Sequence, residues 1–208
     1  KEDGTFGLNI GDTYKDKQMV GIPWRSAFGL QSDGWYLRQD IIWNKPNPMP
    51  ESVKDRCTKA HEYIFLFANS TDYFFDSDAI KQPYAEGTMG GSQFGGKKGN
   101  SELGMKTKLQ SSPQGFSELK DGANMKSVWN IPVKPYAGAH FATFPEKLPE
   151  LCIKAGSKKG DIVLDPFFGS GTTGWVAQRL GRKWLGVELN PDYIKIAEER
   201  FNQQELFL

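Results

Sequence analysis

In the C-terminal third of the chain, the spacing of apolar residues predicts strands and helices in strict alternation. Residues 161–165 and 183–188 are short apolar runs typical of strands, and residues 171–180 between them have helical spacing. Asn190 is expected to cap a last helix, whose apolar face holds Ile194, Ala197 and Phe201. This order is the pattern of parallel strands that are joined by helices.

The N-terminal part predicts three more strands, at residues 5–10, 36–43 and 62–68. The third is a nearly continuous apolar run, as in a strand that is buried on both faces. Apolar spacing also predicts a helix over residues 16–32. A further helix is expected to begin at Phe144-Pro145-Glu146 and to stop at Gly156.

Between these two parts the composition changes sharply. Residues 84–126 are rich in glycine, serine and lysine and poor in large aliphatic side chains, which indicates an irregular insertion. We therefore divide the chain into a first half-domain at 1–83, an insertion at 84–127 and a second half-domain at 128–208. The expected fold class is α/β, with a mostly parallel sheet and helices on both faces.

Charge and cysteine content narrow the class of protein. The 208 residues carry a net charge of +1, which argues against a protein that merely coats nucleic acid but allows one local basic face. The two cysteines, Cys57 and Cys152, cannot form a disulfide framework, and no Cys/His cluster suggests a metal site. A reducing cytoplasm fits best, and no apolar run reaches membrane-spanning length.

The strongest chemical signal is a glycine-rich turn after a strand that ends in Asp165. Gly169 and Gly171 open the following helix, and the next strand ends in Glu188, which can accept hydrogen bonds from ribose hydroxyls. Residues 169–174 also match the dinucleotide pattern, so an NAD-dependent oxidoreductase is an alternative. However, the Asp165 carboxylate would repel a pyrophosphate, whereas it suits the cationic amino acid part of S-adenosylmethionine (SAM).

The segments DPFFGSGTT and GVELNPDY resemble the cofactor motif of DNA methyltransferases that act on exocyclic amino groups. GTFGLNIGDTY and GAHFATFPEKL resemble further blocks of the permuted subgroup, in which the catalytic half precedes the cofactor half. The resemblance implies a Rossmann-like methyltransferase fold, SAM as the cofactor, and methylation of adenine N6 or cytosine N4 in DNA. It also implies that the insertion recognises the target sequence.

The resemblance further implies roles for individual residues. The amino acid part of SAM would contact Asp165, Phe167, Gly169, Gly171 and Thr172. The rest of the pocket would involve Glu188 at the ribose with Asn190 beside it, the segment of His140, Phe144 and Pro145, and Asp12. Lys97, Lys98, Lys106 and Lys108 lie in the insertion, where they would contact DNA phosphates or be simply solvated. The same two interpretations apply to Lys45 and Arg56 in a proline-rich loop.

One expected motif is missing from these residues. The catalytic tetrapeptide of this family is Asp, Asn or Ser, followed by Pro-Pro and an aromatic residue, and no two prolines adjoin here. We expect the tetrapeptide upstream of Lys1. Because it is absent from these residues, a catalytically inactive DNA-binding relative is an alternative. The implied partner is double-stranded DNA with the target base flipped out. A cognate restriction enzyme and a homodimer both remain open.

Overall fold

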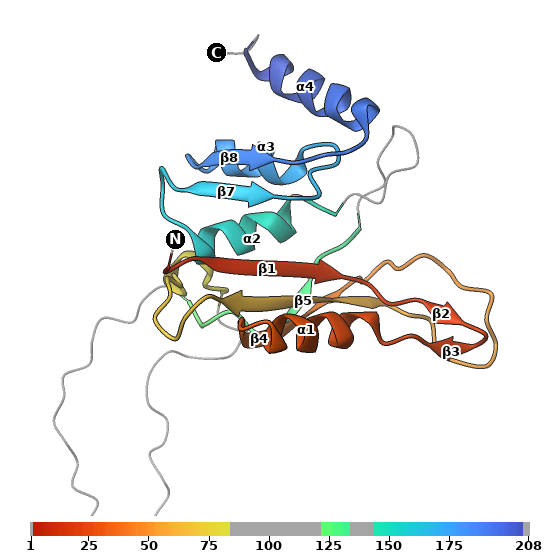
Figure 1. Cartoon of the computed structure of the whole chain (residues 1–208). Coiled ribbons are helices and arrows are strands. Elements are labelled where there is room, and N and C mark those ends of the chain that lie inside the picture. The colour runs from red at the N-terminus through yellow and green to blue at the C-terminus, as the bar shows by residue number, and fades with distance from the viewer. Residues whose placement is uncertain (1, 84–121, 134–143, 206–208) are drawn as a thin grey trace, which may run out of the picture.

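The computed structural model describes residues 2–83, 122–133 and 144–205. Its main sheet has the order β1-β5-β4-β6. These strands span Thr5–Ile10 (β1), His61–Ala68 (β5), Tyr36–Asn44 (β4) and Val128–Asn130 (β6). Figure 1 shows helix α1 (Ile22–Ser32) on one face of this sheet and helix α2 (Lys147–Gly156) on the other.

The apolar run of β5 lies at the centre of the sheet and is buried on both faces, as the sequence predicts. Phe65 and Phe67 pack with Ala27 of α1, whereas Ile64 packs in a second cluster on the α2 side. Trp43, Trp129 and Leu148 belong to that second cluster. The central strand therefore joins two hydrophobic cores, one for each covering helix.

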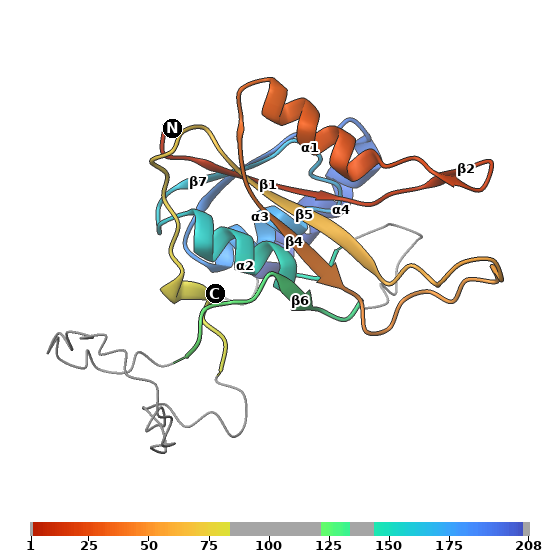
Figure 2. The same ribbon diagram turned by 90° about the horizontal axis from the view of Figure 1, so that it is seen from below.

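The α/β class is confirmed, but the strand pairing is less parallel than expected. β5 is antiparallel to both of its neighbours, β1 and β4, whereas β4 and β6 are parallel. The reason is the connection: β4 leads to β5 through a loop without a crossover helix, and a loop suffices only for antiparallel strands. By contrast, α1 forms the crossover between β1 and β4, which run in the same direction (Figure 2).

The predicted helix over residues 16–32 is wrong in its first turn and a half. Residues Tyr14–Lys15 (β2) and Gln18–Met19 (β3) pair as a small antiparallel hairpin, and α1 begins only at Ile22. Gly21 precedes the helix in the left-handed conformation, with φ of 76°, and such a residue cannot continue a right-handed helix backward. The apolar residues Met19 and Val20 matched the helical spacing without belonging to the helix.

The C-terminal part alternates as predicted. After α2 come β7 (Ile162–Asp165), α3 (Thr172–Arg179), β8 (Lys183–Gly186) and α4 (Pro191–Glu205). β7 and β8 form a separate parallel pair, and α2 packs against α3 through Ile153, Val176 and Ala177. The Asn190 side chain accepts a hydrogen bond from the backbone amide of Asp192 at 2.9 Å, which confirms it as the cap of α4.

The two flanks of the predicted insertion meet beside the main sheet. Gln82 and Ala123 exchange two backbone hydrogen bonds of 3.0 and 2.9 Å, just after the short 3-10 helix η1 (Asp78–Ile80). Residues 84–121 lie outside the described residues. The remaining residues, 122–127, run along the sheet toward β6, a strand that the sequence did not predict. No helix in the described ranges is long and apolar enough to span a membrane.

Candidate functional site

The turn between β7 and α3 is built around the Asp165 carboxylate. Its Oδ1 accepts a hydrogen bond from the backbone amide of Phe167 at 2.9 Å, and its Oδ2 accepts one from the Thr173 hydroxyl at 2.5 Å. Gly169 and Gly171 have φ of 52° and 79°, values at which a side chain is strained. Sequence and backbone together therefore fix an acidic group at the strand end, beside a turn that only glycine accommodates well.

Glu188 lies two residues past the end of the neighbouring strand β8 and is hydrogen-bonded to the same turn. One carboxylate oxygen accepts the backbone amide of Asn190 at 2.8 Å, and the other accepts that of Gly169 at 2.7 Å. These two hydrogen bonds lower the pKa of Glu188 against a smaller opposing effect of burial, so the group is ionised at neutral pH. The glycine turn and the second acidic strand end thus form one hydrogen-bonded unit.

The last glycine of the turn pattern has a packing role. A Cβ at Gly174 would lie 2.6 Å from the Phe168 ring, and a Cβ at Gly186 would lie 2.3 Å from it. The ring stacks on Trp184, with centroids 5.0 Å apart, and fills the space between α3 and β8. The third glycine of the apparent dinucleotide pattern is therefore explained by an aromatic side chain, without a pyrophosphate.

This packing predicts that Gly186→Ala destabilises the protein by about 1–3 kcal/mol, because the new methyl group overlaps the Phe168 ring. The matched control is Gly29→Ala in α1, where nothing lies within 4 Å and alanine should stabilise the helix by about 0.5–1 kcal/mol. Chemical denaturation of both variants measures the difference. Equal stabilities would contradict the packing that we describe.

A charged cluster that the sequence did not predict joins the start of α2 to the end of α3 and to α4. Glu146 forms ion pairs with Arg179 and Arg200 at 2.8 and 2.9 Å. Arg200 also donates a hydrogen bond to the Thr172 hydroxyl at 3.1 Å. Thr172 is buried and directed toward α4, while its neighbour Thr173 is the residue that bonds Asp165. Opposite charges far apart in sequence gave no signal that could have identified this cluster.

The other residues expected at the cofactor pocket have structural partners. Asp12 follows β1, and its carboxylate accepts backbone amides from Thr13, Gly21 and Ile22 at 2.9–3.1 Å. Partial burial raises the pKa of Asp12, but these amides and the nearby Lys59 outweigh it and lower the pKa overall. Phe144 packs on the α2-side core, Pro145 is buried at the start of α2, and His140 lies outside the described residues.

Of the residues expected at DNA, Lys45 and Arg56 are engaged within the protein. Lys45 forms an ion pair with Glu62 and lies 4.4 Å from the centre of the Trp43 ring. Arg56 pairs with Glu51 and stacks on Tyr14 at 4.1 Å. Both charges are therefore largely compensated before any ligand binds. Lys97, Lys98, Lys106 and Lys108 lie outside the described residues.

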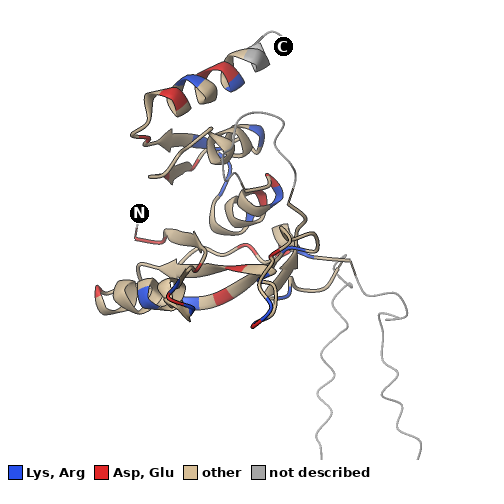
Figure 3. Cartoon of the chain, turned by 90° about the vertical axis from the view of Figure 1, so that its right-hand side faces the viewer, with Lys and Arg blue, Asp and Glu red and all other residues tan. Residues whose placement is uncertain are grey.

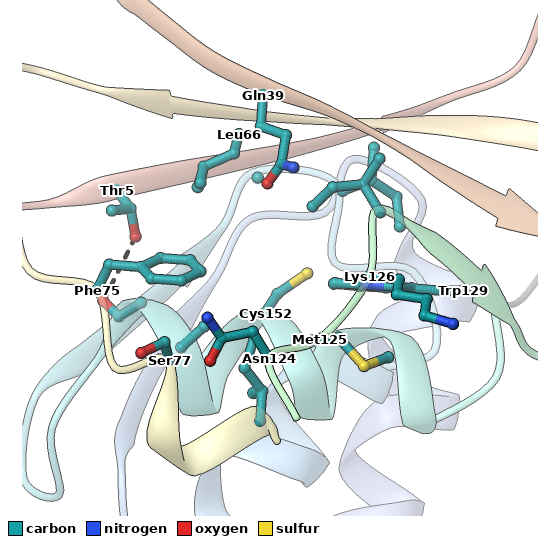
Figure 4. Close-up of a pocket in the computed structure, with 16 residues that line it drawn as sticks. Thr5, Gln39, Leu66, Phe75, Ser77, Asn124, Met125, Lys126, Trp129 and Cys152 are labelled. Atoms are coloured by element: carbon teal, nitrogen blue, oxygen red, sulfur yellow. Dashed lines mark hydrogen bonds between the residues drawn. The ribbon is translucent and has the colours of Figure 1, made fainter. Parts of the chain in front are cut away.

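A cavity of about 220 Å³ lies away from the glycine turn, between the main sheet and α2 (Figure 4). Thr5 and Gln39 line it from the sheet, Cys152 from α2, and Asn124 and Met125 from the flank of the insertion. Burial raises the pKa of Cys152 to about 12, so its thiol stays protonated and unreactive. We place the candidate site at the strand ends, because the acidic groups and glycines converge there.

Solved structures define the class of this fold. PvuII DNA methyltransferase (cytosine-N4-specific) superposes with a TM-score of 0.71 at 23% identity, over 97% of this chain and 64% of that one. M1.HpyAVI in complex with SAM gives a TM-score of 0.58 at 21% identity, over 96% and 76% of the two chains. The fold is therefore that of a methyltransferase, as the sequence predicted.

The chain belongs to the N6/N4 methyltransferase family of DNA methylases, whose family model matches residues 1–199. It is 42% identical to the type II methyltransferase M.SmaI of Serratia marcescens, over 96% of this chain and 68% of that protein. It is 43% identical to M.XycI of Xanthomonas campestris pv. cyanopsidis, over 98% and 66%. The chain thus spans about two thirds of the length of these relatives.

Proposed function

We propose that the protein transfers a methyl group from SAM to adenine N6 or cytosine N4 at specific sites in DNA. Family membership and the relatives named as type II methyltransferases support this activity. The observation that carries it in the structure is the unit of Asp165, the glycine turn and Glu188 at adjacent strand ends. M1.HpyAVI has been solved with SAM on the same fold, which supports SAM as the cofactor.

The described residues fit this cofactor. A carboxylate has about four lone-pair positions, so Glu188, which accepts the backbone amides of Gly169 and Asn190, keeps acceptor capacity for ribose hydroxyls. Phe167 and Leu189 lie two and three residues past the ends of β7 and β8 and are 86% and 96% exposed. They offer apolar surface to a nucleoside, while the Asp165 charge suits an ammonium group. Asn190 supplies its backbone amide to Glu188 and so positions the ribose acceptor.

When bound, SAM supplies an electrophilic methyl group. The exocyclic amine that receives it is a weak nucleophile, because its lone pair is delocalised into the base. We propose that the polar residue and a proline carbonyl of the missing tetrapeptide accept its hydrogens, and that the aromatic ring stacks on the flipped base. These preorganised acceptors lie outside the 208 residues, since the sequence contains no Pro-Pro pair.

Two features of the described residues leave room for further chain beside the site. β1 pairs only with β5, and β7 pairs only with β8, so each keeps one unpaired edge among the described strands. Ile162, Leu164 and Leu185 of the β7–β8 pair are exposed, although parallel strands are normally covered on both faces. β1 and β7 point the same way in Figure 1, which supports a tetrapeptide-bearing segment packing near both.

The test is transfer of labelled methyl groups from SAM to mixed-sequence DNA by the whole protein. The proposal predicts labelled DNA, whereas an NAD-dependent oxidoreductase or an inactive DNA-binding relative would leave the DNA unlabelled. Thermal shifts with SAM and with NAD separate the methyltransferase from the oxidoreductase, because a ligand raises the unfolding temperature only of a protein that binds it. A shift with NAD alone would contradict the proposal.

We propose that residues 84–127 recognise the target sequence. They are rich in glycine, serine and lysine, and their flanks meet at Gln82 and Ala123, so the insertion can leave and re-enter the fold at one place. A short linker replacing residues 84–121 should preserve SAM affinity and abolish sequence-specific methylation. Both are measured on the whole protein by calorimetry and by mapping methylated sites. Unchanged sites in the trimmed protein would contradict this assignment.

The type II relatives also suggest a biological partner. We propose that the protein protects DNA against a restriction enzyme of the same specificity, as expected for a modification enzyme of that type. Methylated plasmid from cells that express the protein should resist cleavage by that enzyme.

A further inference from the structure

The β2–β3 hairpin and the loop after β4 form a projecting arm, which we define as residues 12–21 and 45–60. Figure 1 shows both segments extending past the end of β1, on the side toward which β7 and β8 point. Because β7 ends in Asp165 and Glu188 follows β8, the arm projects from the same edge of the fold as the candidate cofactor site. A ligand that covers this edge would meet the arm.

Internal contacts hold the arm at both ends. At its base, the Asp12 carboxylate accepts the amides of Gly21 and Ile22, which fixes the hairpin to the start of α1. At its tip, Lys17 forms an ion pair with Asp55 of the loop at 2.9 Å. The two turn residues, Asp16 and Lys17, have φ of 51° and 65°, a conformation that residues other than glycine seldom adopt. The hydrogen bonds of Asp12 and the stacking of Arg56 on Tyr14 therefore preorganise the arm, and the exposed Lys17–Asp55 pair adds little to this.

The cations of the arm fall into two groups. Lys17, Lys45 and Arg56 are compensated by Asp55, Glu62 and Glu51. Lys15 and Lys54 are exposed and form no ion pair with any described residue, and Lys59 has only a longer-range attraction to Asp12. Tyr14 faces Arg56, so strand alternation directs Lys15 to the other side of the hairpin. Figure 3 views the arm from its tip, where basic and acidic segments alternate.

We infer that Lys15, Lys54 and Lys59 contact the phosphate backbone of the DNA substrate, and that Lys45 and Arg56 instead hold the arm in shape. This inference rests on the proposed function and names the part of the molecule that positions DNA against the cofactor edge. Uncompensated lysines on a rigid projection suit phosphates, which fix the register of a duplex without reading its sequence. The exposed Asp16 carboxylate at the tip opposes the same contact.

The test is DNA affinity as a function of salt, measured by fluorescence anisotropy on the whole protein with a short duplex. Each variant Lys15→Gln, Lys54→Gln and Lys59→Gln should reduce the slope of log K against log salt by about 0.9, the value for one lost phosphate contact. Asp16→Asn should tighten binding at low salt, because it removes the carboxylate that opposes the contact. Asparagine also tolerates the left-handed turn conformation, so the hairpin should keep its shape. The matched control is Lys159→Gln, in the loop before β7 at the opposite edge of the fold, which should match the unsubstituted protein.

The SAM affinity of every variant should equal that of the unsubstituted protein, so that a loss of DNA affinity reflects the contact itself. Methyl transfer by the unsubstituted protein, together with unchanged salt slopes in all three lysine variants, would overturn this inference and leave the proposed function intact. Absence of DNA binding by the unsubstituted protein would overturn both.

Discussion

A polypeptide limited to these 208 residues is expected to methylate DNA at least about 100-fold more slowly than a protein that also carries the Pro-Pro-aromatic tetrapeptide. The acidic strand ends and the glycine turn are present, so we expect these residues to bind the cofactor. The groups that would accept the hydrogens of the target amine are not, because no two prolines adjoin in the sequence. Without them the amine keeps its delocalised lone pair, and the flipped base loses its stacking platform.

The measurement compares the 208-residue chain with a longer protein that also carries the tetrapeptide, using labelled SAM and mixed-sequence DNA. Two polar side chains near the ends of β5 and β1, His61 and Asp12, are already engaged within the protein. The Asp12 carboxylate is occupied by backbone amides, and the His61 ring packs edge-on against Tyr63, with centroids 5.5 Å apart. Robust transfer by the 208-residue chain alone would show that the activating group lies among these residues.

The second large effect is expected at the two acidic strand ends. Asp165→Ala and Glu188→Ala should each weaken SAM binding by about 1–3 kcal/mol, or roughly 5- to 150-fold, because each removes a charged acceptor. Glu188→Ala also releases the amides of Gly169 and Asn190, so it should disturb the turn as well as the ribose contact. Isothermal calorimetry on the purified variants gives the affinities.

Two further variants separate the effect of the Asp165 charge on SAM binding from its effect on the conformation of the turn. Asp165→Asn keeps an acceptor for the Phe167 amide, so it should preserve the turn and lose only the attraction to the cofactor ammonium group. Asp192→Asn removes an exposed carboxylate in the first turn of α4 and should leave SAM affinity unchanged. Full affinity in both Asp165→Ala and Glu188→Ala would place the cofactor elsewhere.

Local sequence signals were sufficient to predict helices and strands where the periodicity of apolar residues and the turn residues agree. The C-terminal alternation of strands and helices, the cap at Asn190 and the buried run of β5 all follow from residues close in sequence. The candidate site was predictable for the same reason, since Asp165 and Gly169–Gly171 occupy one turn and Glu188 lies one strand further on.

Contacts between distant residues were not predictable. The antiparallel placement of β5 depends on which strands it lies between, which periodicity does not report. The hairpin at residues 14–19 contains apolar residues that also fit a helix. Only the left-handed conformation of Gly21 shows that these residues do not belong to α1. Likewise, Lys45 and Arg56 look like free cations in the sequence, because Glu62 and Glu51 become their partners only in the folded chain.

The most direct test of the central claim is the identity of the modified nucleoside. DNA treated with the whole protein and SAM is hydrolysed, and its nucleosides are separated by chromatography and identified by mass spectrometry. The proposed function predicts N6-methyladenine or N4-methylcytosine, formed only when SAM is present. Unmodified DNA, or a methyl group at cytosine C5, would contradict it.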